Sequence, residues 1–221
     1  MRLVLASASP RRAELLRAAG FRFETRAVDL DERVRPGEAP KDYVRRLAME
    51  KSARALELLS ETNPAEAAGE GPAKAGHYVR SAMAPVSGVA SGFSRTVVLG
   101  ADTAVVIDGT ILGKPRDDED AAFMLRRLSG RAHEVMTGVS LRKPGWEASR
   151  VETTTVEFLQ LSDADIRWYV ESGEGRDKAG AYAIQGLASR LIPSIRGSYS
   201  NVVGLPIAVV HQLVAEIASR P

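Results

Sequence analysis

The chain has 221 residues, with 30 Lys and Arg against 28 Asp and Glu, and it contains no cysteine. Disulfides and thiolate metal sites are therefore excluded, and the length is sufficient for a substantial core. The basic residues form no long block, so the composition does not favour a nucleic-acid-binding surface. No apolar run reaches the roughly 18 residues of a membrane span, and no targeting segment is evident at the start. We expect a soluble, cytoplasmic protein without nucleic-acid or membrane partners.

The first motif is Ser-Ala-Ser-Pro-Arg-Arg at residues 7–12, directly after an apolar run over 3–6. Ser9 is a favoured N-cap residue and Pro10 suits the first helical position, which predicts that a strand turns into a helix here. Arg11 and Arg12 then occupy the first helical turn, where the helix dipole disfavours positive charge. An anion held by the helix N-terminus and both guanidinium groups would resolve this conflict. The alternative is two solvated surface arginines.

Acidic residues follow a short predicted strand over 21–25. Asp29, Asp31 and Glu32 lie close together in a polar connection, where they could bind a divalent cation or simply face solvent. The next predicted helix runs from Pro40 to about residue 60. Lys51 lies on the apolar face of this helix, so its ammonium group either extends to solvent or meets an anion in a cleft.

Between about 60 and 95 the composition changes to Ala, Gly, Pro, Ser and Glu without apolar periodicity. Such a segment buries too little apolar surface to offset its ordering entropy. We therefore expect a mobile insertion within one domain that covers residues 1–221.

Asp102 is the strongest candidate for a general base or metal ligand. It lies in a short polar segment between two strand-forming runs, 97–100 and 104–107, and burial of an unpaired carboxylate is costly. Asp108-Gly109 predicts a hairpin, after which Lys114 precedes a proline. His133 fits a hydrogen-bonding role in a strand better than a metal-binding role. The other predicted elements are a helix over 117–128, strands over 133–142 and 147–158, and helices over 162–172 and 205–218.

Seven motifs, in this order, resemble those of the Maf family of nucleoside triphosphate pyrophosphatases. They are Ala6–Arg12, Glu50-Lys51, Gly100–Thr103, Gly113–Pro115, Asp177–Tyr182, Ile184–Gly186 and Val203–Pro206. The resemblance implies a single two-lobed α/β domain with a twisted mixed sheet, flanking helices and a nucleotide cleft. It also implies hydrolysis of a nucleoside triphosphate to the monophosphate and pyrophosphate with a divalent metal cation, Mg²⁺ or Mn²⁺. Arg11, Thr103 and Gln185 look like the subtype that acts on dTTP and UTP.

The same resemblance implies roles for ten residues. The residues expected to act in catalysis are Asp102, Glu32, Lys51 and Lys114, with Asp102 activating water and sharing the metal with Glu32, which could instead be the base. Those expected to bind substrate are Ser9, Arg11, Arg12, Thr103, Lys178 and Gln185, the last through its amide and a uracil or thymine edge. The competing hypothesis is a non-catalytic regulator of cell division that binds a nucleotide or a protein. A homodimer is compatible with either hypothesis.

Overall fold

The computed structural model describes residues 1–62 and 96–219. Most of the predicted insertion at about 60–95 lies outside these residues, and residues 60–62 belong to a helix. The strands are β1 (Arg2–Ala6), β2 (Phe23–Thr25), β3 (Thr96–Ile107), β4 (Thr110–Leu112), β5 (Ala132–Lys143), β6 (Trp146–Glu157) and β7 (Ser194–Arg196). The α-helices are α1 (Pro10–Ala18), α2 (Pro40–Thr62), α4 (Asp118–Leu128), α5 (Asp163–Glu171), α6 (Tyr199–Val203) and α7 (Ile207–Ala218), with 3-10 helices η2 (Ala179–Ala181) and η3 (Leu187–Leu191).

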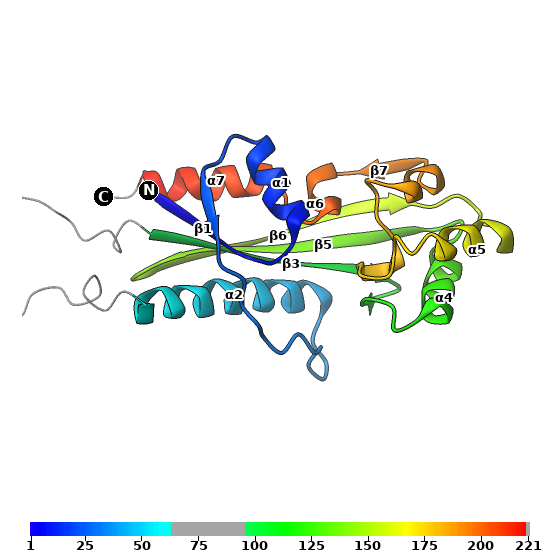
Figure 1. Ribbon diagram of the computed structural model, residues 1–221, viewed down its shortest axis with the longest axis horizontal. Coiled ribbons are helices and arrows are strands. Elements are labelled where there is room, and N and C mark those ends of the chain that lie inside the picture. The colour runs from blue at the N-terminus through cyan, green and yellow to red at the C-terminus, as the bar shows by residue number, and fades with distance from the viewer. Residues whose placement is uncertain (63–95, 220–221) are drawn as a thin grey trace, which may run out of the picture.

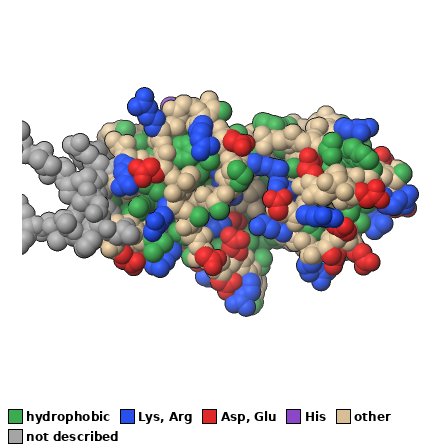
Figure 2. All heavy atoms as spheres, in the orientation of Figure 1, with side chains coloured by type: hydrophobic (Ala, Val, Ile, Leu, Met, Phe, Trp, Pro, Cys, Tyr) green, Lys and Arg blue, Asp and Glu red, His purple; other side chains and the backbone are tan. Residues whose placement is uncertain are grey.

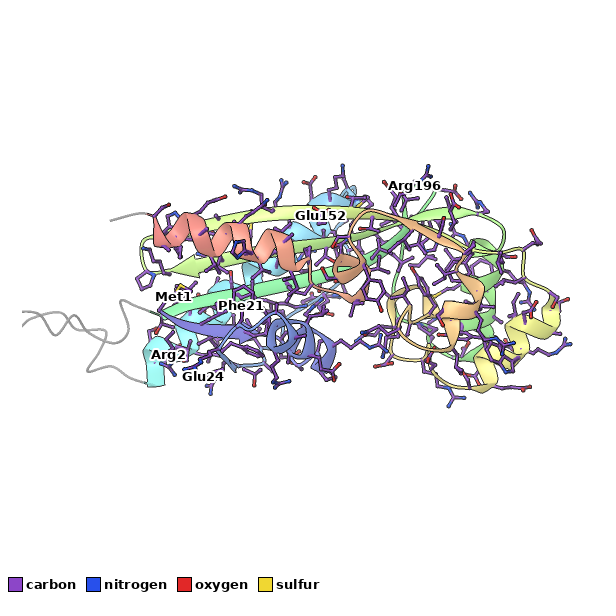
Figure 3. All side chains as sticks on the ribbon, turned by 90° about the horizontal axis from the view of Figure 1, so that it is seen from above. Met1, Arg2, Phe21, Glu24, Glu152 and Arg196 are labelled. Carbon is purple, nitrogen blue, oxygen red and sulfur yellow. The ribbon has the colours of Figure 1, made fainter. Side chains whose placement is uncertain are left out.

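The strands form one mixed sheet in the order β2-β1-β3-β5-β6-β7, with β4 paired to β3. β1 is parallel to β2 and β3, whereas the pairs from β3 to β7 are antiparallel. Figure 1 shows α2 on one face of the long strands and α1 and α7 on the other. α4 and α5 lie at the end of the molecule that is far from the two chain termini. In Figure 3, Arg2 and Glu24 mark one edge of the sheet and Glu152 and Arg196 mark the other. The predicted α/β fold with a mixed sheet and flanking helices is confirmed.

Two large apolar clusters give the molecule its two lobes. One includes Leu125 and Tyr169 around α4 and α5, and the other includes Leu5, Leu16 and Leu213 beneath α1 and α7. β3 contributes buried side chains to both clusters. β5 does the same, with Val135 in one cluster and Val139 and Leu141 in the other, so long strands of the sheet connect the lobes.

β3 differs from the prediction, because the runs 97–100 and 104–107 are parts of one continuous strand that includes Asp102. β5 pairs with β3 from Val98↔Arg142 to Val106↔Glu134, so the ladder continues through the polar positions. The other edge of β3 is paired only in part. The β1 pairing ends at Ala6↔Gly100 and the β4 pairing begins at Val105↔Leu112, so within the described residues no strand covers 101–104 on that side.

Two glycines allow α2 to approach the sheet closely. A Cβ atom at Gly100 would lie 2.1 Å from the Ala48 carbonyl oxygen, and one at Gly138 would lie 2.1 Å from the Val44 carbonyl oxygen. Side chains alternate along a strand, so Gly100 and Asp102 share the face of β3 that meets α2. The close approach consequently brings α2, and Lys51 with it, against the strand that carries Asp102.

We expect Gly138→Ala to lower the melting temperature, because its methyl group would collide with the backbone of α2. Overpacking of this kind costs about 1–3 kcal/mol, or several degrees for a chain of this length. Gly113→Ala is the matched control, since a Cβ there meets nothing within 4 Å and the backbone is not left-handed. Thermal denaturation of both variants checks the prediction, and equal melting temperatures would contradict it.

Candidate functional site

A cavity of about 650 Å³ lies beside the uncovered edge of β3. One wall is formed by the turn from β1 into α1, with Glu32, Tyr43 and Lys51. The other wall is formed by the segments 111–114, 177–179 and 182–184, while 202–204 lies beside Arg12, which donates to the Gly204 carbonyl. Figure 2 shows basic and acidic side chains gathered around a hollow near the middle of the molecule. The gap between β1 and β4 thus exposes a mid-strand aspartate to a cleft between the two lobes.

Lys51 bridges two carboxylates in this cavity. Its Nζ atom lies 2.6 Å from Asp102 Oδ1 and 2.6 Å from Glu32 Oε1. Burial raises the pKa of Asp102, and the positive charges of Lys51 and Arg12 oppose this shift without cancelling it. For Glu32, partial burial also raises the pKa, but the hydrogen bond from Lys51 and the charges of Lys51, Lys114 and Arg12 together outweigh it, and the net shift is downward. The two carboxyl groups therefore differ in basicity although they share one ammonium partner.

The paired carboxylates also fit a divalent metal. No group of three or more His, Asp or Glu side chains that could hold a metal occurs among residues 1–62 and 96–219. Mg²⁺ is commonly bound by one or two carboxylates together with substrate phosphates and water, so a complete protein cage is not needed. Because Asp102 and Glu32 each reach the same nitrogen, their oxygens are close enough to converge on one ion. The donor set thus has the chemistry that Mg²⁺ or Mn²⁺ prefers.

Arg12 is part of the scaffold of this site. Its guanidinium group donates to the carbonyl oxygens of Gly204 (2.8 Å) and Ala101 (2.9 Å) and to the hydroxyls of Ser7 (3.2 Å) and Thr103 (3.1 Å). These bonds use four of the five N–H donors that a guanidinium group has. The bond to the Ala101 carbonyl takes the place of a strand partner at the uncovered edge of β3. The conflict of Arg12 with the helix dipole is therefore resolved by protein acceptors.

The other predicted cations line the cavity and are more accessible. Arg11 and Lys114 belong to opposite walls, and Lys178 forms an ion pair with Asp177. Ser9 is the N-cap of α1, as predicted, but its hydroxyl makes no capping bond. Basic residues outnumber acidic ones in the lining, which creates a potential that attracts anions. The start of α1 adds its unpaired backbone N–H groups to this potential.

Known proteins resemble this chain along nearly its whole length. The family model for "Maf-like protein" matches residues 2–217. The chain belongs to the Maf-like protein family. A relative from Anaeromyxobacter dehalogenans, named dTTP/UTP pyrophosphatase, is 49% identical over 96% of this chain and 92% of its own length. Another of the same name, from Shewanella oneidensis, is 47% identical over 98% of both chains. The solved structure of the Staphylococcus aureus Ham1 protein covers 98% of this chain and 99% of its own, with a TM-score of 0.49 and 13% identity.

Two of the expected substrate-binding residues lie differently in this Maf-like protein from what their motifs predict. The hydroxyl of Thr103 contacts the Arg12 guanidinium group, the Thr137 hydroxyl (3.0 Å) and the Gly204 carbonyl (3.3 Å). Thr103 lines the cavity, but its single O–H donor is directed to protein acceptors and one lone pair accepts from Arg12. Gln185 is exposed and does not belong to the residues that line the cavity, although its neighbour Ile184 does. Sequence adjacency placed Gln185 near the site but could not orient its side chain.

Sequence reasoning missed Tyr43, which lines the cavity from α2 and donates to the backbone carbonyl of Glu32 at 3.0 Å. Burial and the charges of Asp102 and Glu32 raise its pKa to about 12, so the phenol stays protonated. Tyr43 and Lys51 could have been found together, since both lie on the face of α2 toward the sheet.

Across the described part of this Maf-like protein, no helix is long and apolar enough to span a membrane.

The neighbouring arginines allow a direct test of the scaffold role. We expect Arg12→Lys to lower the free energy of unfolding by about 2 kcal/mol or more, because an ammonium group cannot make four divergent bonds and leaves buried acceptors unpaired. Arg11→Lys, at a partly exposed position, should change it by less than about 0.5 kcal/mol. Urea denaturation of both variants measures the difference. Equal loss of stability would contradict the assignment.

Proposed function

We propose that this protein hydrolyses dTTP and UTP to the monophosphates and pyrophosphate. The observation that carries the proposal is a buried carboxylate, Asp102, paired with Lys51 in a cavity with excess positive charge. The relatives that are named dTTP/UTP pyrophosphatase, at 47–49% identity over nearly their full length, support the choice of substrate. We also propose a cytoplasmic location, consistent with the absence of cysteine. The homodimer stays a prediction.

In this proposal the triphosphate binds between the two walls. Arg11 and the start of α1 contact it from one wall, and Lys114 and Lys178 contact it from the other. The fifth N–H of Arg12, which has no acceptor within residues 1–62 and 96–219, can add one further bond. Together these donors bind the pyrophosphate portion and stabilise the charge that it gains as it leaves.

Asp102 then acts as the general base. Lys51 contacts its Oδ1 atom, while Oδ2 has no hydrogen-bond donor among the described residues and can accept a proton from water. The water oxygen attacks the α-phosphorus, the bond from that phosphorus to the bridging oxygen breaks, and pyrophosphate departs. The proton passes to Asp102. Its raised pKa makes it a stronger base than an ordinary aspartate.

Asp102 and Glu32 would hold the divalent metal, with Lys51 moving from its position between them toward the phosphates. When bound, Mg²⁺ or Mn²⁺ would neutralise phosphate charge and polarise the phosphoryl oxygens. The side chain of Glu32 is 50% exposed and belongs to a loop, whereas that of Asp102 is 10% exposed and belongs to a strand. Glu32 can therefore adjust to an ion more readily than Asp102.

The pyrimidine preference is attributed to Gln185, whose amide can pair with the carbonyl and N–H edge of uracil or thymine. Since its side chain is exposed at the margin of the cavity, this contact requires the amide to turn inward over Ile184.

A non-catalytic regulator would have no need for a buried carboxylate beside cations, which is why we favour the enzyme. Direct assay of purified protein with nucleotides and Mg²⁺ or Mn²⁺ separates the two hypotheses.

Asp102→Asn should abolish turnover and leave nucleotide binding largely intact. Loss of a general base costs on the order of 10² to 10⁴ in rate, while the cations that bind phosphate are retained. Asp163→Asn, at an exposed position on α5, is the control for the same chemical change and should retain full activity. Pyrophosphate release and equilibrium nucleotide binding measure the two effects. Activity of Asp102→Asn within about threefold of the wild type would remove Asp102 from the mechanism.

Substrate choice is tested by kcat/KM for dTTP, UTP, CTP, GTP and 7-methyl-GTP. We expect the wild type to favour dTTP and UTP by roughly tenfold or more, since an unpaired polar group costs about 1–3 kcal/mol. Gln185→Glu should weaken pyrimidine turnover, because its carboxylate repels the base carbonyl. Gln212→Glu on the exposed side of α7 is the matched control. A profile that is flat, or that is unaltered by Gln185→Glu, would contradict the role of Gln185.

A further inference from the structure

The segment 182–188, which follows η2, is fixed to the protein at several points. The Tyr182 hydroxyl and His133 Nε2 are 2.8 Å apart, and the rings of both residues contact Phe158. At the next residue, the backbone N–H of Ala183 donates to the Tyr169 hydroxyl at 3.0 Å. Tyr182, Ala183 and Ile184 all line the cavity. One wall of the site is therefore held from behind by buried polar groups.

Glu174 completes this arrangement. Its Oε2 atom accepts from the Tyr169 hydroxyl at 2.8 Å, and its Oε1 atom accepts from the backbone N–H of Leu187 at 2.9 Å. Oε2 also lies 3.4 Å from the backbone nitrogen of Ala188. One carboxylate thus joins the tyrosine that binds Ala183 to the start of η3. Ile184 and Gln185 lie between these two attachment points.

The residue at 186 leaves room for this carboxylate. A Cβ atom on Gly186 would lie 1.7 Å from Glu174 Oε1. The φ of Gly186 is −120°, outside the left-handed region that favours glycine. The first effect of an alanine here would therefore be to displace the flexible end of the Glu174 side chain.

The cavity lining is unevenly divided between charge and apolar surface. Asp102, Lys51, Arg12 and Glu32 cluster at one part, as their mutual contacts and charges indicate. Much of the apolar lining belongs to, or packs against, the cluster around α4 and α5, including Val105, Leu112, Tyr182 and Ile184. A triphosphate needs the first kind of surface and a nucleobase needs the second.

We propose that Tyr169 and Glu174 are positioning residues for nucleoside selection, which hold Ala183 and Ile184 as the wall against which the base lies. The inference rests on the proposed function, because it assumes a nucleotide in the cavity. Neither residue contacts the reacting atoms. Their effect is to keep the segment 183–188 in one conformation before the substrate arrives, so that binding does not include the cost of ordering it.

The test compares three variants that disturb the same contacts in different ways. Tyr169→Phe removes the hydroxyl, Glu174→Ala removes the carboxylate, and Gly186→Ala displaces it. We expect each to raise KM for dTTP about fivefold or more, because only a fraction of the protein has the competent wall, and to lower the preference for dTTP over GTP. The double variant Gly186→Ala/Glu174→Ala should raise KM for dTTP no more than either single variant, since both substitutions act on the same carboxylate.

Inorganic tripolyphosphate, tested as a competitive inhibitor, reports on the charged part of the cavity alone. Its inhibition constant should stay within about twofold in all three variants, a result that general loss of structure would not give. Glu171→Gln, at an exposed position on α5, is the control and should match the wild type. Unchanged selectivity in the variants, or weaker tripolyphosphate binding parallel to the rise in KM, would overturn the inference. Absence of hydrolysis by the wild type would instead overturn the proposed function.

Discussion

The buried ion pair between Asp102 and Lys51 is the interaction on which the site depends. Removing a carboxylate and an ammonium group from water is costly, and the protein recovers this cost only when the two are held at hydrogen-bond distance. The distance of 2.6 Å requires α2 to lie directly on β3, which Gly100 and Gly138 permit. Glu32 adds a second anion to the same ammonium group. The electrostatics of the cavity therefore follow from how closely one helix approaches the sheet.

The incomplete edge of β3 explains how a strand can carry such a residue. A strand that is fully paired on both edges would leave no gap in the sheet beside Asp102. Here β1 turns into α1 at Ala6, before β3 reaches Asp102, and β4 begins after it. The backbone group exposed at this gap still needs a partner, because buried carbonyl groups are almost always hydrogen-bonded. Arg12 supplies that partner for Ala101. The gap thus gives a ligand access to the site, and Arg12 bonds to the backbone carbonyl that the gap leaves without a strand partner.

Local signals in the sequence predicted much of this structure. Ser9-Pro10 placed the start of α1, the apolar period placed α2, and the hairpin after β3 followed from Asp108-Gly109. The predicted two strands over 97–107 were wrong, because pairing along β5 overrides the local polarity around Asp102. Contacts between residues far apart in the chain could not be predicted from local sequence patterns either. Arg12 meets the carbonyl of Gly204, 192 positions away, and no pattern in either motif indicates that bond. Likewise, no motif indicates that the backbone N–H of Leu187 donates to the Glu174 carboxylate.

Thr103 shows how a difference between subtypes can act without contact with the base. The resemblance to the pyrimidine subtype rests partly on the threonine at this position. The Thr103 hydroxyl, however, bonds to Arg12, Thr137 and the Gly204 carbonyl, and the Thr137 hydroxyl continues to the Asn201 carbonyl at 3.2 Å. Replacement of Thr103 would remove its bonds that support the 201–204 segment, and residues 202–204 line the cavity. A change at 103 would therefore alter the shape of the cavity by shifting its support. Selectivity in this fold can thus reside in buried hydrogen bonds behind the wall as much as in the side chains that face the nucleotide.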